Sequence, residues 1–198
     1  MKKLLIIFAS VLFSLSLSGI KAQDYSNYQR VFLGYNMFTY NDAESMYNGV
    51  NLGWSYGLNL TSQKPLFLEF GAEIAYEKGE TSYIAKNKHD GFVNEKRREN
   101  QINFSVPVVV AYQFSINESV KVAPYTGPNF RVNILEDAGG LDLMNDRPSS
   151  NRFQFGWNAG LDFVISKFII GYRFTGDITS YYHKNTDQYH NVRIGYKF

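Results

Sequence analysis

Residues 50–60, VNLGWSYGLNL, alternate large apolar side chains with small or polar ones along their whole length. The large side chains occupy the even positions, and glycine, asparagine and serine occupy the odd ones. Successive side chains of a β-strand point to opposite faces, so a repeat of two residues predicts a strand with one large apolar face and one small polar face. The stretch therefore predicts a β-sheet protein with one face in an apolar environment.

The same alternation recurs along the chain. It is strong at residues 66–76, 102–112 and 153–165, and weaker at 28–40, 119–133, 167–179 and 188–198. The connections alternate between short ones, at 61–64, 115–118 and 166–167, and longer ones, at 41–48, 79–99, 134–151 and 180–187. Transmembrane barrels have an even number of strands, short periplasmic turns and longer extracellular loops. We therefore expect an all-β fold: an eight-stranded antiparallel up-and-down transmembrane β-barrel.

A soluble lipocalin-like barrel would show the same alternation with its apolar face turned inward. The second face distinguishes the two, because a water-facing surface should be rich in Lys and Glu. Here it is dominated by Gly34, Gly53, Gly57, Gly71, Gly127, Gly156, Gly160, Gly171 and Gly195. Small residues suit a crowded interior. We expect the outer wall to carry the aromatic residues Trp54, Tyr56, Tyr76, Tyr112, Trp157, Tyr172 and Tyr196.

The first residues predict export. Lys2 and Lys3 precede an apolar run at 4–17 that ends in small residues, which is typical of a secretory signal peptide. We expect cleavage after Ala22, which divides the chain into a signal peptide at 1–22 and a barrel domain at 23–198. The signal carries three lysines and no acid, so its removal changes the formal net charge from +2 to −1. A nearly neutral chain is a poor partner for nucleic acid.

No cofactor or metal site is expected. The chain has no cysteine, which excludes disulfides, an acylated cysteine and cysteine-based zinc sites. The acidic loop 134–151 lacks the residue spacing of a calcium-binding loop.

The last strand ends the chain on an aromatic residue. Ile194, Tyr196 and Phe198 alternate to the end, and this resembles the C-terminal signal that the barrel assembly machinery recognises in outer-membrane β-barrel proteins.

A wider resemblance covers nearly all of the chain after residue 23. Its features are the junction at 21–23, the segment INFSVPVVVAYQF at 102–114 with Pro107 inside a strand, APYTGPNF at 123–130, and NAGLDFVI at 158–165. These resemble the outer-membrane β-barrel family common in Bacteroidota, often labelled porin-family or PorT-like, with an OmpA/OmpX-type eight-stranded barrel. The resemblance implies a bacterial outer-membrane location and defines a barrel type, without an activity.

Charged side chains on the inward parity predict a plugged lumen. We expect Glu69, Glu73, Asp162, Arg173 and Arg193 to form a charge network, with Glu73 and Arg173 paired at mid-barrel height. Buried charges need partners, and an eight-stranded barrel is only wide enough for side chains to fill. A functional polar pathway is the alternative interpretation.

The loop at 79–99 is the candidate for surface contacts. Lys86, Lys88, Lys96, Arg97 and Arg98 are available to pair with phosphates of lipopolysaccharide, although such a run also occurs in plain solvated loops. Outer-membrane lipid and lipopolysaccharide are therefore the expected partners, with the barrel assembly machinery during biogenesis. Protein partners of the extracellular loops cannot be named from the sequence.

An enzyme that modifies lipid A is a further alternative, because some eight-stranded barrels act in this way with a His, a Ser and an acid near the outer leaflet. Ser180, His183, Asp187 and His190 lie near the expected outer rim, but no nucleophile motif frames them. We expect no catalytic residues, and a non-enzymatic structural or surface-interaction role. An accessory subunit of a secretion or transport complex remains open beside it.

Overall fold

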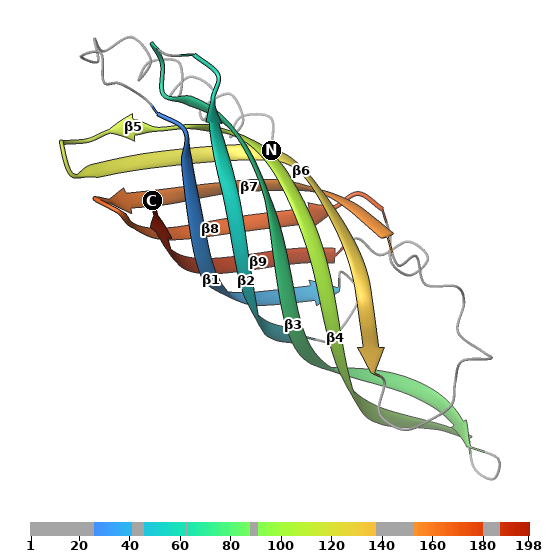
Figure 1. The fold of residues 1–198 in the computed structure, drawn as a ribbon. Coiled ribbons are helices and arrows are strands. Elements are labelled where there is room, and N and C mark those ends of the chain that lie inside the picture. Colours follow the sequence, from blue (N-terminus) through green and yellow to red (C-terminus); the bar gives the residue numbers. More distant parts are fainter. Residues whose placement is uncertain (1–25, 41–45, 62, 88–90, 138–152, 180–186) are drawn as a thin grey trace, which may run out of the picture.

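The computed structural model describes residues 26–40, 46–61, 63–87, 91–137, 153–179 and 187–198. The elements are antiparallel strands that wrap into one closed wall (Figure 1). They are β1 (Tyr28–Tyr40), β2 (Met46–Asn59), β3 (Leu66–Asn87), β4 (Gly91–Tyr112), β5 (Phe114–Ser115), β6 (Val120–Asp137), β7 (Phe153–Ile165), β8 (Phe168–Asp177) and β9 (Asp187–Lys197). No helix in these ranges is long and apolar enough to cross a bilayer.

The strand pairing closes the barrel, so no wall strand has an unpaired edge at mid-height. Strands that follow one another in sequence pair, except that β4 pairs with β6 and not with the short β5, and β1 pairs with β9. The short β5 continues β4 after a break at Gln113 and also pairs with β6, so β4 and β5 count as one wall strand. This confirms the eight-stranded antiparallel up-and-down barrel. Closure lets the backbone of each wall strand form hydrogen bonds on both sides. This is required inside a bilayer, because each unpaired N–H or C=O group in hydrocarbon would cost several kcal/mol.

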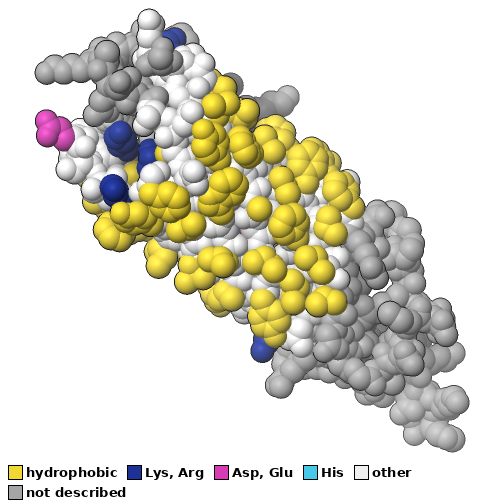
Figure 2. Space-filling model, viewed as in Figure 1, with side chains coloured by type: hydrophobic (Ala, Val, Ile, Leu, Met, Phe, Trp, Pro, Cys, Tyr) yellow, Lys and Arg dark blue, Asp and Glu magenta, His cyan; other side chains and the backbone are white. Residues whose placement is uncertain are grey.

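The outer wall is apolar at mid-height. Figure 2 shows hydrophobic side chains spread over the face that β1 to β4 form, with few charged side chains on its described part. All seven aromatic residues expected on the outer wall are exposed or half-exposed. Most inward positions of the same strands are buried. Large residues outside and polar ones inside is the arrangement that lipid requires, opposite to that of a soluble barrel.

The interior holds more aromatic residues than the alternation suggests. The expectation of small residues inside is incomplete, because Tyr28, Phe32, Phe38, Tyr47, Phe67, Tyr125 and Tyr189 are all buried there. Glycines on neighbouring strands leave space for some of these rings, as the positions of Phe32 and Tyr125 show. A Cβ atom on Gly53 would overlap the ring of Phe32, and one on Gly160 would overlap the ring of Tyr125. Gly53 and Gly160 are therefore recesses that receive a ring from the next strand.

The prediction of a loop at 79–99 is wrong for most of its length. β3 continues to Asn87 and β4 starts at Gly91, and their ladder runs from Gly79↔Glu99 to Asn87↔Gly91. β6 likewise continues to Asp137, into the stretch expected as the loop 134–151. These extensions lie beyond the apolar band, so their sequence has no reason to alternate between apolar and polar residues.

Candidate functional site

The lumen is the most highly charged part of the described structure. Five carboxylates and four guanidinium groups are buried in it, from Arg30, Glu69, Glu73, Glu77, Arg131, Asp162, Arg173, Asp177 and Arg193. Each stands at an inward position of its strand. Strand alternation alone brings them to the lumen, and the barrel then decides which of them meet.

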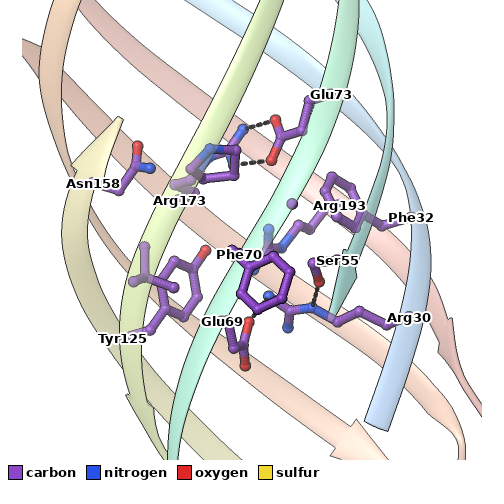
Figure 3. A pocket seen from close by; sticks show the side chains of 13 residues that line it. Arg30, Phe32, Ser55, Glu69, Phe70, Glu73, Tyr125, Asn158, Arg173 and Arg193 are labelled. Atoms are coloured by element: carbon purple, nitrogen blue, oxygen red, sulfur yellow. Dashed lines mark hydrogen bonds and ion pairs between the residues drawn. The ribbon is translucent and has the colours of Figure 1, made fainter. Parts of the chain in front are cut away.

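A bidentate ion pair crosses the barrel at mid-height. Arg173 of β8 donates to both carboxylate oxygens of Glu73 of β3, at 2.5 and 2.6 Å (Figure 3). Asn51 Nδ2 donates to the same carboxylate at 3.3 Å. β3 and β8 are not neighbours in the sheet, so this pair ties opposite parts of the wall together.

Asp162 organises the part of the network nearer the short turns. The side chain of Asp162 is fully buried and accepts from Arg193 Nη2 at 2.8 and 3.0 Å and from Arg30 Nη1 at 2.5 Å. Arg30 also donates to Ser55 Oγ at 2.7 Å and to Glu69, which in turn accepts from the Tyr28 hydroxyl. Arg30 and Arg193 thus share Asp162, and Arg30 extends these contacts to Glu69.

The part nearer the long connections contains a carboxylate held by amides. Glu77 accepts from Asn36 Nδ2 at 3.0 Å, Gln101 Nε2 at 2.9 Å and Asn103 Nδ2 at 2.8 Å. Arg131 pairs with Asp177 nearby, and its guanidinium lies 3.6 Å from the centroid of the Tyr189 ring.

The structure brings together all five residues of the predicted network, and Glu73 contacts Arg173. Strand parity also predicts the inward positions of Glu77 and Arg131, whereas the sequence interpretation missed Arg30 and Asp177. Arg30 shares the inward parity of Gly34, and Asp177 shares that of Arg173, so both were detectable from alternation. The amide ligands of Glu77 were not detectable, because Asn and Gln also occur at outward and loop positions.

Little space is left between these side chains. The cavity beside the Glu73–Arg173 pair has a volume of about 10 Å³, and its lining includes Phe32, Tyr125 and Asn158. That is close to the least volume that holds one water molecule. Three polar atoms without a protein partner belong to residues that line it, namely Tyr125 Oη, Asn158 Nδ2 and Arg173 Nε. The arrangement can bind about one water molecule, and its paired charges present neither a free acid nor a free base to a substrate.

The residues of the expected C-terminal signal lie on the outer wall. Ile194, Tyr196 and Phe198 are all exposed at outward positions of β9 or directly after it. The main chain of Phe198 exchanges hydrogen bonds of 3.0 and 3.1 Å with Gln29 of β1. The last residue therefore takes part in closing the barrel.

The other candidate residues are only partly described. Lys86 lies on the backbone of β3, Lys96, Arg97 and Arg98 lie on that of β4, and Lys88 is outside the described residues. Of the residues considered for lipid A chemistry, Ser180 and His183 are outside them as well, and Asp187 begins β9.

His190 has a partner on the outer wall. Its Nδ1 lies 2.5 Å from the hydroxyl of Tyr172 on β8, and the ring of Phe174 lies 5.4 Å away, centroid to centroid. A tyrosine–histidine pair between aromatic side chains is an ordinary interfacial contact.

Several solved structures match this chain. Ail, the attachment invasion locus protein of Yersinia pestis, is 14% identical, with 87% of this chain and 97% of that chain covered and a TM-score of 0.40. The Neisserial surface protein A is 14% identical, with 87% and 97% covered and a TM-score of 0.44. The outer membrane enzyme PagL is 14% identical, with 84% and 98% covered and a TM-score of 0.44. No curated protein matches significantly.

The family model named outer membrane protein beta-barrel domain matches residues 8–198. This agrees with the closed eight-stranded wall and its apolar outer face. The protein is located in the bacterial outer membrane, and the chain belongs to the outer-membrane β-barrel protein family.

Proposed function

We propose that the barrel is a closed, non-enzymatic membrane anchor that presents its β3–β4 hairpin to components of the cell surface. The observation that carries this is the length of the hairpin. β3 pairs with β2 only as far as Gly79, and β4 pairs with β6 only as far as Asn100, but β3 and β4 stay paired to Asn87↔Gly91. The hairpin thus continues beyond the barrel wall, as Figure 1 shows.

The form of this hairpin suits recognition. Beyond the last β2 and β6 pairings, the described part of the hairpin has backbone N–H and C=O groups along both outer edges. Such edges bind extended segments of other proteins by strand addition. The sequence of the hairpin also contains Lys86, Lys96, Arg97 and Arg98 alongside Glu80, Glu95 and Glu99, so it offers charged groups of both signs to a partner. The packing of the lumen supports the same role, because a cavity of about 10 Å³ is too small for a ligand and binding would take place at the surface.

The finer classification is part of the proposal. The motifs at 102–114, 123–130 and 158–165 support a place among the PorT-like barrels of Bacteroidota, and the first 22 residues support export through a cleaved signal peptide. An accessory role in a secretion or transport complex is the main competing function. It predicts a stable partner protein at the membrane or at the periplasmic turns.

Site-specific photo-crosslinking in intact cells tests the proposal. A photoreactive phenylalanine analogue at Tyr83, in the hairpin, should give a discrete adduct with a surface component. The same analogue at Ile116, in an exposed turn at the other rim, is the control and should not give that adduct. The proposal fails if positions along the hairpin give no adduct, or if Ile116 captures a subunit of a transport complex while the hairpin captures nothing. The closed lumen is tested separately: purified protein should give no large, steady conductance in planar bilayers.

A further inference from the structure

An apolar groove of about 230 Å³ crosses the outer wall over β1 to β4. The strand register aligns its sides as two rows of cross-strand neighbours. One row is Leu33, Leu52 and Ile74, and the next row toward the hairpin is Val50, Tyr76 and Ile102. The floor between the rows is formed at Asn51 and Ala75. The groove lies within the apolar surface of Figure 2, so its occupant in the membrane is hydrocarbon.

The height of the groove can be worked out along β3. The outward residues from Leu66 to Tyr76 are all apolar or aromatic. At ~3.3 Å per residue and a tilt of about 40°, these ten steps cover ~25 Å along the membrane normal, which is the usual height of the apolar band of a barrel. The next outward residue is Lys78. It stands at the level of the lipid headgroups, on the rim away from the short turns, and therefore in the outer leaflet.

Lys78 is linked to the groove through Tyr76. Its Nζ lies 5.3 Å from the centroid of the Tyr76 ring, which lines the groove, and the Tyr76 hydroxyl lies 3.4 Å from Asn100 Oδ1. Among the outward strand residues whose side chains are described, Lys78 is the only charged one. An ammonium group, a phenol and an amide thus mark one end of an apolar groove, on a wall that is otherwise uncharged over the same range.

We propose that this groove and Lys78 form a binding site for one phosphorylated, acylated lipid of the lipopolysaccharide class. An acyl chain occupies the groove, and a phosphate at the headgroup level pairs with the Lys78 ammonium. The outer leaflet selects this class, because the phospholipids of the inner leaflet place their headgroups at the opposite rim. The site is separate from the β3–β4 hairpin and does not depend on its proposed role.

Native mass spectrometry of the purified full-length barrel, titrated with diphosphoryl lipid A, tests the site. Lys78→Gln should weaken binding about fivefold, because an exposed charge pair contributes up to about that factor. Val50→Phe fills the groove while Lys78 stays in place, and it should weaken binding as well. Unchanged heat-modifiable mobility on SDS gels shows that each variant is folded.

Two matched variants serve as controls. Lys167 lies 5.9 Å from the ring of Tyr196 in the turn at the opposite rim, so Lys167→Gln removes a similar contact from the wrong leaflet. Val110→Phe enlarges an exposed valine on β4, opposite Leu68 and eight residues from Ile102 toward the short turns, so it lies away from the groove. Both should bind diphosphoryl lipid A like the wild type, and phosphatidylglycerol should bind the wild type more weakly.

Three results would overturn the site. Equal binding by the wild type, Lys78→Gln and Val50→Phe would show that the lipid does not occupy this groove. Phosphatidylglycerol binding as tightly as diphosphoryl lipid A would show that no lipopolysaccharide-class lipid is selected. A dimer that Val50→Phe abolishes would assign the groove to a second copy of the chain.

Discussion

Arg173→Ala removes one partner of the ion pair that crosses the barrel and leaves the other in place. The Glu73 side chain is only 4% exposed, and its carboxylate keeps the hydrogen bond from Asn51 Nδ2 at 3.3 Å. Breaking a buried pair from one side costs about 3 to 5 kcal/mol, because the remaining charge is left without compensation in a low-dielectric site. A cost of ~4 kcal/mol corresponds to roughly a thousandfold change in the unfolding equilibrium.

The chain offers its own probe for this measurement. Its two tryptophans, Trp54 and Trp157, are 39% and 47% exposed on the outer wall, so their fluorescence reports contact with lipid and leaves the lumen undisturbed. Urea titration of the barrel in phospholipid vesicles, followed at these residues, gives the free energy of unfolding. Lys64→Ala, in an exposed turn, is the control and should change it by less than about 0.5 kcal/mol.

The pair predicts a further result that a loss of packing alone would not give. The double variant Glu73→Gln/Arg173→Gln removes both charges, so it should be more stable than the single variant Arg173→Gln, which has the same side chain at position 173, even though it changes two residues. The reasoning is refuted if Arg173→Ala lies within about 1 kcal/mol of the wild type, or if the double variant is less stable than Arg173→Gln.

Three more predictions concern export, assembly and packing. The mass of the protein purified from outer membranes should equal that of the chain cleaved after Ala22, and an uncleaved or differently cut chain would contradict this. Deletion of Phe198 should leave export intact and reduce the heat-modifiable, folded form in outer-membrane fractions; normal insertion would show that the terminal aromatic residue is not needed. Gly53→Val should destabilise the barrel by about 1 to 3 kcal/mol, because its side chain would overlap the ring of Phe32. Gly176→Val is the matched control, since the nearest atom to its Cβ is at an ordinary 3.4 Å, and equal melting of the two valine variants would contradict the recess.

The alternation of the sequence determined the strands and the two faces. In a pleated strand every second side chain points the same way, so the local sequence of a stretch such as 50–60 shows which side chains face lipid and which face the lumen. The same parity assigned Glu73, Asp162, Arg173 and Arg193 to the interior. It failed at 80–99, because beyond the membrane neither face of the hairpin must be apolar and the pattern that marks a strand disappears.

Only the tertiary structure decided which inward residues meet. Glu73 and Arg173 are a hundred positions apart on strands that are not neighbours, and Asp162 joins Arg30 and Arg193 in a similar way. Their heights depend on the tilt and stagger with which the sheet closes, and these are properties of the whole barrel. The recess at Gly53 has the same origin, because a missing Cβ becomes useful only when the register places Phe32 directly opposite. Local sequence fixes the direction of each side chain, whereas closure of the barrel fixes its partner.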